Sequence, residues 1–343
     1  MELLKKLTEA PGASGREDVV REIIVAEMKT CMDEVTVDSM GSVIGVKKSA
    51  AKNPKKVMIC AHMDEIGFIV SHIDKNGFIR FVPVGGFDPR VLLAQRVIIH
   101  GKQPLHGIIG SKPIHILDDA ERNKTLQLKD LFIDTCIPKK ALEKIVEIGN
   151  PVTIERQFIE FGDKNKFVCC KAFDDRVGVY VMLKTIQALK KADVDVYAVA
   201  SVQEEVGLRG AQTTSFAIQP DLGVALDVTL ANDMPGVGEH DHISTLGGGT
   251  AIKLLDSAAI SHMRLVEFMK NTAKKKKIKY QMEILPRGGT DSGAMQRSRG
   301  GIPVVTLSIP TRYVHSSVET AHKDDIEASI KLLTAFLMEA HKF

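Results

Sequence analysis

The stretch FVCCKAFDDRVGVYVMLKTIQALKKADVDVYAVASVQEEVGLRG, residues 167–210, carries the pattern that decides the fold. Apolar runs predict strands at Phe167–Lys171 and Asp195–Val202, and the segment between them has helical spacing at Arg176–Lys190. The alternation of strands and helices continues through the C-terminal half of the sequence. It predicts an α/β fold with a mixed, mainly parallel sheet that is covered by helices.

The region between residues 72 and 162 has a different texture. Short β-rich runs alternate there with Gly and Pro turns, as in VPVGGFDPR (82–90), and one helix is predicted at Pro138–Glu147. A chain of 343 residues is longer than one hydrophobic core usually supports. We therefore expect a small β-rich module at 72–162 that interrupts a larger domain made of 1–71 plus 163–343.

The composition argues against several classes of partner. With 46 basic and 43 acidic residues the formal net charge is +3, which favours neither nucleic acid nor an anionic membrane. No apolar stretch approaches the length that spans a bilayer, and the first residues lack the pattern of a signal peptide. The five cysteines lack CxxC spacing, so we expect reduced core thiols in a cytoplasmic protein.

The segment Ser14-Gly15-Arg16-Glu17 matches a capping box, with Ser14 at the N-cap and Glu17 at the third helical position. The apolar residues that follow it keep helical spacing. We expect Ser14 to cap a helix that begins here.

Polar side chains follow apolar runs at several points along the chain. They are His62, Asp64, Asp174, Asp175, Glu204, Glu205, Asp227 and His315. Each one alone has an ordinary structural explanation, such as a helix cap or a hydrogen-bonded histidine. Open α/β sheets, however, bind ligands at the carboxyl ends of their strands, where these residues would meet. Several acids would repel each other there, two divalent cations would relieve the repulsion, and mixed histidine and carboxylate ligands suit zinc, cobalt or manganese.

The adjacent acids Glu204 and Glu205 leave the chemistry of the site open. A solvated turn is the simplest interpretation, and the acid and nucleophile of a glycosidase are another. A glycosidase needs its two carboxyl groups about 5–9.5 Å apart, whereas neighbours on an extended strand point to opposite faces. The chain also has no Trp and only four Tyr for stacking on sugars. A related dinuclear carboxypeptidase or deacylase, and a shell-forming scaffold with a decayed site, are further alternatives.

Six motifs, taken in order, favour one family. They are HMDEIGF (62–68), FDDRVG (173–178), EEVGLRGA (204–211), ALDVT (225–229), PRGGTDSGAM (286–295) and RYVHSSVE (312–319). In this order they resemble the tetrahedral-shell dinuclear metallo-aminopeptidases, the M-forty-two peptidases. That family includes glutamyl aminopeptidases and proteins labelled cellulase or endoglucanase. The resemblance runs from the first predicted helix to the last.

The resemblance implies an aminopeptidase that removes N-terminal residues from short peptides. It implies a catalytic domain (1–71 plus 163–343) interrupted by a small β-barrel-like dimerisation domain (72–162), and dimers that assemble into a dodecamer. Two divalent ions per subunit are implied, zinc or cobalt first and manganese as the third candidate. The preferred N-terminal residue of the substrate stays open.

The site roles are carried over from the matching motifs. His62 and Asp227 would bind one ion, Glu205 and His315 would bind the other, and Asp174 would bridge the two. These five residues form the expected metal centre.

Two further acids would act beside the ions. Asp64 would accept the other ring N–H of His62 and so fix its tautomer. Glu204 would be the general base that takes a proton from the reacting water.

Three more features follow from the same motifs or lie near them. The resemblance implies a cis peptide between Asp174 and Asp175, and it places Arg287–Met295 in the wall of the substrate pocket. His240 and His242 in GEHDH (238–242) lack a complete ligand set, so we expect a surface or assembly role for them.

Overall fold

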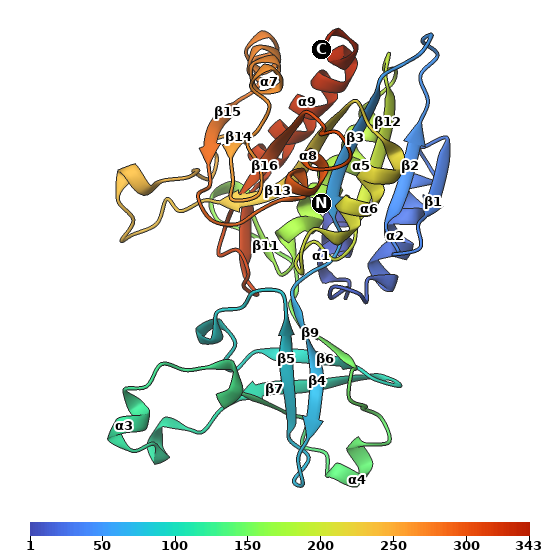
Figure 1. Cartoon of the computed structure of the whole chain (residues 1–343). Helices are drawn as coiled ribbons and strands as arrows, with labels where there is room; N and C mark the ends of the chain where they lie inside the picture. Colours follow the sequence, from blue (N-terminus) through green and yellow to red (C-terminus); the bar gives the residue numbers. More distant parts are fainter.

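The computed structural model describes all 343 residues and shows two bodies of unequal size (Figure 1). The larger body contains an 11-stranded mixed sheet with four parallel strands at its centre. In spatial order these are β12 (Asp195–Ser201), β3 (Lys56–His62), β13 (Leu222–Leu230) and β16 (Val304–Arg312). The outer strands are β1 (Glu34–Val37), β2 (Val43–Lys47), β10 (Ile159–Phe161), β11 (Phe167–Cys170), β14 (Thr250–Leu255), β15 (Tyr280–Ile284) and β17 (Glu319–His322).

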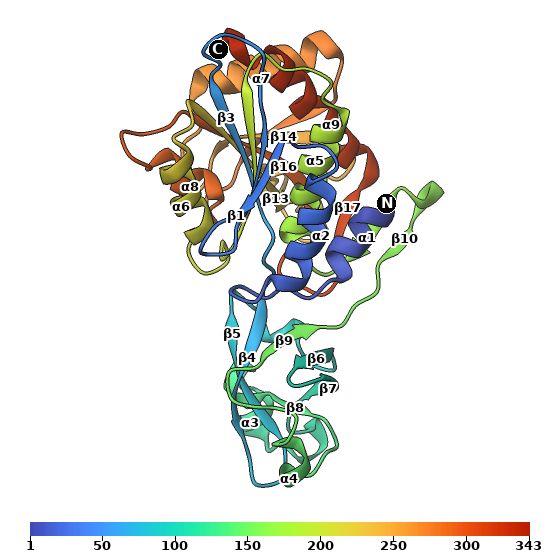
Figure 2. The same cartoon turned by 90° about the vertical axis from the view of Figure 1, so that its right-hand side faces the viewer.

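Helices cover both faces of this sheet, as the view in Figure 2 shows. One face carries α1 (Glu2–Glu9), α2 (Asp18–Met28), α5 (Phe173–Ala188), α7 (Met263–Lys276) and α9 (Lys323–Glu339), and the other carries α6 (Arg209–Ile218) and α8 (Asp291–Gln296). Successive residues of β3 point to opposite faces of the sheet. Ile59 belongs to the apolar core under the larger group of helices, and Met58 belongs to the core under α6 and α8. Burial on both faces explains why the central strands are apolar along most of their length. None of the helices has the length and apolar character needed to cross a membrane.

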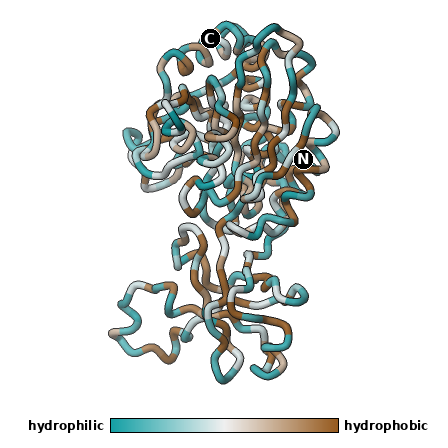
Figure 3. Tube along the Cα trace, turned by 45° about the vertical axis from the view of Figure 1, so that its right-hand side comes forward, coloured by the Kyte–Doolittle hydropathy of each residue, from teal (hydrophilic) through white to brown (hydrophobic).

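The smaller body is a closed antiparallel barrel of six strands, in the order β4-β5-β8-β7-β6-β9. A separate apolar core fills it, and Phe68 and Ile133 are among its fully buried members. Figure 3 shows apolar segments converging at the centre of this body. Its elements are β4 (Gly67–Ile73), β5 (Ile79–Val84), β6 (Arg96–His100), β7 (Pro104–Gly110), α3 (Asp119–Arg122), β8 (Phe132–Asp134), α4 (Lys139–Leu142) and β9 (Pro151–Ile154).

The predicted α/β fold with an inserted β-barrel is confirmed, but the strands shift the limits of the insertion. The barrel runs from Gly67 to Ile154 rather than from 72 to 162. The reason at the first limit is that β4 continues almost directly from β3, so no linker marks the boundary. At the second limit, β10 pairs with β11 in the large sheet, although both strands lie near the insertion in sequence.

The expected capping box at Ser14 is wrong. Helix α2 begins at Asp18, with Glu17 at the N-cap and no side-chain cap. The Ser14 hydroxyl instead donates a hydrogen bond to Oδ2 of Asp64 at 2.5 Å, and Glu17 accepts the N–H of Gly15. A buried carboxylate competes successfully for the hydroxyl because a hydrogen bond to a charged acceptor is stronger than a neutral cap.

Candidate active site

The polar residues predicted from the sequence meet at one edge of the large sheet. Strands β12, β3, β13 and β16 are parallel, so their carboxyl ends reach the same edge, and β3 leads from there into the barrel. His62 ends β3, Asp227 lies in the second half of β13, and His315 follows β16. Asp174 joins them from the first turn of α5.

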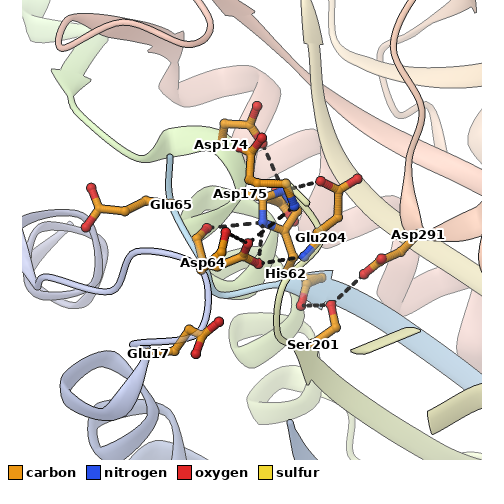
Figure 4. Close-up of polar contacts among 12 residues, drawn as sticks. Glu17, His62, Asp64, Glu65, Asp174, Asp175, Ser201, Glu204 and Asp291 are labelled. Carbon is orange, nitrogen blue, oxygen red and sulfur yellow. Dashed lines mark hydrogen bonds and ion pairs between the residues drawn. The ribbon is translucent and has the colours of Figure 1, made fainter. Parts of the chain in front are cut away.

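His62 lies at the centre of the cluster and is 1% exposed. Its Nε2 atom is 3.0 Å from Oδ1 of Asp174 and 4.0 Å from Oε2 of Glu204. Its Nδ1 atom is 3.1 Å from the main-chain oxygen of Asp64 and 3.4 Å from Oδ1 of the same residue. Figure 4 shows the imidazole between the Asp64 and Asp174 carboxylates, with Glu204 beside it. The ring is therefore held on one side and presents its second nitrogen to the acids.

Asp174 connects the two histidines. Its Oδ1 atom faces His62, and its Oδ2 atom lies 3.3 Å from Nε2 of His315. The same His315 nitrogen is 3.3 Å from Oε2 of Glu205. One carboxylate that offers an oxygen to each histidine has the arrangement that a bridging ligand requires.

The electrostatics of the cluster reflect many acids in a small buried volume. Burial raises the pKa of Glu204, Glu205 and Asp227, and neighbouring carboxylates raise these pKa values further. Burial lowers the pKa of His315, but the hydrogen-bonded carboxylates of Asp174 and Glu205 outweigh it and raise this pKa to about 12. The site thus contains more carboxyl groups than the two imidazoles could balance if all of these groups were ionised.

Two overlapping groups of side chains could each hold a metal ion. The first group is His62, Asp174 and Glu205, and the second is His62, Asp175 and Asp227. Within each group the possible ligand atoms lie within 4.8 Å of one another. Oε1 of Glu205 and Oδ2 of Asp175 are buried and have no hydrogen-bond partner. Buried carboxylate oxygens without a donor are costly, so a cation fits this donor set well.

Asp175 is a member of the cluster that was not predicted as a ligand. It follows Asp174 across a cis peptide bond, as the resemblance implied. Its Oδ1 atom accepts the N–H of Gly178, and one of its two carboxylate oxygens belongs to the second group. The repeated acid in FDDRVG was the available sequence signal, and helix capping explained it equally well.

The pair Glu204 and Glu205 lies in a turn beyond β12 and not on the strand itself. Their side chains diverge because of this turn, which Gln203 enters with a left-handed φ of 56°, rather than because of strand alternation. Oδ1 of Asp64 accepts the N–H of Glu204 at 3.0 Å, and Oδ2 accepts that of Glu205 at 3.3 Å. The carboxylate of Glu205 reaches His315, whereas that of Glu204 belongs to neither metal group.

A pocket of about 500 Å³ opens over the cluster. The cluster supplies acidic and imidazole side chains to its lining, and the segment from Arg287 to Thr290 supplies another part of it. Apolar side chains complete the lining, namely Leu208, Val228, Leu230, Leu285 and Val314. Asp291–Met295, which was also expected in the wall, is buried in α8 and does not line this pocket.

Comparison with known proteins decides the family. A sequence model of the M42 glutamyl aminopeptidase family matches residues 41–332. The chain belongs to this family. It is accordingly a peptidase, a hydrolase that acts on peptide bonds, and its fold is that of other M42 members.

Individual M42 relatives match nearly the whole chain. The lysyl aminopeptidase of Pyrococcus furiosus is 38% identical over 98% of this chain and 96% of its own length. The structure of aminopeptidase APDkam598 from the archaeon Desulfurococcus kamchatkensis has a TM-score of 0.94 and 42% identity, and covers 98% of this chain and 94% of that one. The structure of PhTET1-12s, with a dodecamer in its asymmetric unit, has a TM-score of 0.87 and 32% identity, and covers 98% of both chains.

The GEHDH segment of this M42 chain lies apart from the cluster. His240 and His242 are exposed, and Nε2 of His240 is 3.4 Å from Asp241. Neither of the two groups that could hold a metal ion includes them.

Proposed function

We propose that this M42 chain is a dinuclear metal-dependent aminopeptidase that removes N-terminal residues from short peptides. The observation that carries the proposal is the position of Asp174, whose two carboxylate oxygens lie 3.0 Å from His62 and 3.3 Å from His315. Such an arrangement suits a carboxylate that bridges two ions. His62 and Asp227 would hold one ion, and Glu205 and His315 would hold the other.

The donor set supports borderline-soft divalent ions. Two imidazoles and three carboxylates suit zinc or cobalt, with manganese as the third candidate, while calcium prefers oxygen ligands alone. When bound, the two ions polarise the scissile carbonyl and make a water acidic enough to react near neutral pH. The family model and the side-chain cluster both agree with a requirement for divalent metal.

Glu204 is the proposed general base. Its carboxylate is 10% exposed and faces His62 without joining either metal group, so it is free to exchange protons. It takes a proton from the attacking water as the oxygen adds to the carbonyl carbon. It then delivers that proton to the peptide nitrogen as the C–N bond breaks, which yields a free amino acid and a shortened peptide.

Asp64 positions both the proposed metal ligand His62 and the proposed base Glu204. It contacts His62 on one side and accepts the N–H groups of Glu204 and Glu205 on the other. The side chain of the substrate's first residue would enter the pocket between the cluster and the segment at Arg287. The apolar lining around that segment would exclude water from the reacting bond.

The alternative of a glycosidase is disfavoured by the contacts of the two glutamates. Glu205 is engaged with His315 at 3.3 Å and is not free to serve as an acid or nucleophile across a sugar bond.

A carboxypeptidase or deacylase would need a basic residue to bind a free carboxylate. Arg312 is paired with Asp233 at 2.7 Å, and Arg287 lines the pocket. Blocking the α-amine of the substrate separates these activities, because it should abolish hydrolysis only by an aminopeptidase.

We also propose that the barrel mediates dimerisation and that dimers assemble into a dodecamer, as in PhTET1-12s. Exposed apolar side chains on the barrel support this, including Ile108, Ile114 and Ile116, which are 54%, 64% and 64% exposed. Light scattering on the full chain should give twelve times the subunit mass of 37.6 kDa. A monomeric mass would contradict the proposed assembly without affecting the proposed chemistry.

The experiment that tests the function uses a panel of aminoacyl p-nitroanilides, each with a free or an acetylated α-amine. The protein is stripped of metal and then assayed with zinc, cobalt or manganese added back separately. We expect no hydrolysis without metal, restored hydrolysis with at least one ion, and no hydrolysis of acetylated substrates. Hydrolysis that survives complete metal removal would contradict the proposal.

A further inference from the structure

Arg156 lies in the connection that leaves the barrel, between β9 and β10. Its Nε atom donates to the main-chain oxygen of Ser317 at 3.1 Å, and its Nη2 atom donates to the hydroxyl of the same serine at 2.9 Å. Nη2 also donates to Oε1 of Gln95 at 3.3 Å. Ser317 is only 2% exposed, so this side chain binds a buried segment and not a solvated one.

Gln95 connects this guanidinium to the barrel through hydrogen bonds. It directly precedes β6, and its main-chain oxygen accepts the N–H of Ile109 at 2.9 Å. Its side-chain amide donates to the main-chain oxygen of Val91 at 2.9 Å. Arg156 therefore links a well-anchored barrel residue to Ser317 in the other body.

The segment that Arg156 holds, Tyr313–Glu319, carries the proposed ligand His315. Tyr313 and His315 both have a left-handed φ of 61°, which residues with a side chain adopt only when their surroundings enforce it. Within the segment, the hydroxyl of Ser316 donates to the main-chain oxygen of Tyr313 at 2.5 Å. The N–H of His315 is bound by Oε1 of Glu319 at 2.8 Å.

These local bonds fix the two ends of the segment, and Arg156 fixes its centre. The guanidinium is the group that reaches Ser317 from the barrel side, and it does so with two donors in a planar fork. A two-point bond of this kind fixes orientation as well as distance. Loss of the fork would let the centre of the segment move, and His315 lies two residues away.

We propose that Arg156 is a positioning residue through which the barrel holds His315 in place, so that tight binding of the ion at His315 and Glu205 depends on the barrel. The inference rests on the proposed function for the identity of that metal site. It predicts a selective effect, because no contact joins Arg156 to His62 or Asp227. The ion at His62 and Asp227 should bind normally without the guanidinium.

The test is calorimetric titration of the metal-free full chain with Zn²⁺, in wild type, Arg156→Ala and Arg156→Lys. Wild type should show two binding events. In Arg156→Ala one event should weaken about 10- to 100-fold, the usual effect of removing a group that orients a ligand, and the other should change less than about twofold. Arg156→Lys should fall in between, because an ammonium cannot reproduce the planar fork.

The matched control is Arg96→Ala. Arg96 is a barrel arginine next to the same connection, with Nε 3.7 Å from Glu155 and its side chain 64% exposed, and it does not contact the His315 segment. Both of its binding events should match those of wild type. Excess Zn²⁺ should restore peptidase activity in Arg156→Ala, whereas a folding defect would not respond to metal.

The outcomes separate the two proposals. Equal weakening of both events in Arg156→Ala, or no weakening of either, overturns the positioning role. If Arg156→Ala does not fold, Ser317→Ala removes one acceptor of the fork and must weaken the same single event. A wild-type chain that binds no metal would refute the proposed function itself, which is a different result from either of these.

Discussion

Oδ1 of Asp64 accepts the main-chain N–H of Glu204 at 3.0 Å. The same carboxylate lies 3.4 Å from Nδ1 of His62 and accepts the hydroxyl of Ser14 at 2.5 Å. Burial raises its pKa, but the hydrogen bonds from these donors outweigh burial and lower it. One fully buried acid therefore holds both a proposed metal ligand and the turn that carries the proposed base.

Asp64→Asn should weaken metal binding about 10- to 100-fold, as loss of a residue that orients a ligand usually does. The amide keeps one acceptor oxygen, but its NH₂ group then faces donors that the carboxylate had satisfied. Calorimetric titration with Zn²⁺ measures the effect. Asp74→Asn is the control, because Asp74 also accepts main-chain N–H groups but lies in a hairpin of the barrel. The metal affinity of this variant should equal that of wild type.

Removal of metal should destabilise the folded chain as well as inactivate it. Without cations the buried carboxyls of Glu205 and Asp227 both face the charge of Asp174, and burial has already raised their pKa values. An ion present at a hundred times its Kd stabilises the folded state by about 2.7 kcal/mol. Thermal unfolding with and without a chelator should therefore give a lower Tm for the stripped protein, and an identical Tm would contradict a structural contribution from the ions.

The cysteines should differ sharply in reactivity towards iodoacetamide. Burial raises the pKa of the Cys170 thiol to about 11, and it also raises that of Cys60. Cys136 is exposed. Mass spectrometry of the native protein at pH 8 should show rapid alkylation at Cys136 and slow alkylation at the buried thiols, while the denatured chain should react at all five positions. Fast alkylation of Cys170 in the native protein would indicate that the β11 core opens readily.

The meeting of the polar residues at one edge of the sheet could be predicted from the sequence, whereas several contacts around them could not. Residues at or near the carboxyl ends of parallel strands must lie at one edge of the sheet, so His62, Asp227 and His315 could be placed together from local patterns. Strand β17 was not predicted. It begins four residues after the proposed ligand His315, and its pairing with β11 and β16 is a contact that a local pattern does not reveal.

The features that were missed depend on contacts between distant parts of the chain. Ser14 has a local capping pattern, but its hydroxyl is taken by Asp64, fifty residues away. The two glutamates diverge because Asp64 fixes the turn they lie in, which the strand pattern before them could not reveal. The bond between Arg156 and Ser317 joins positions 161 residues apart, so no local pattern predicts it.

The most direct test of the central claim is the Glu204→Gln variant, measured both for bound metal and for kcat/KM on an aminoacyl p-nitroanilide. The amide keeps the shape of the side chain and leaves the main-chain bonds to Asp64 in place, but it cannot accept a proton. We predict two bound ions per subunit and a rate about 10²- to 10⁴-fold below wild type. Glu205→Gln, the matched neighbour, should instead lose affinity for one ion. A near wild-type rate in Glu204→Gln, or the loss of an ion from it, would contradict the assignment of Glu204 as the base.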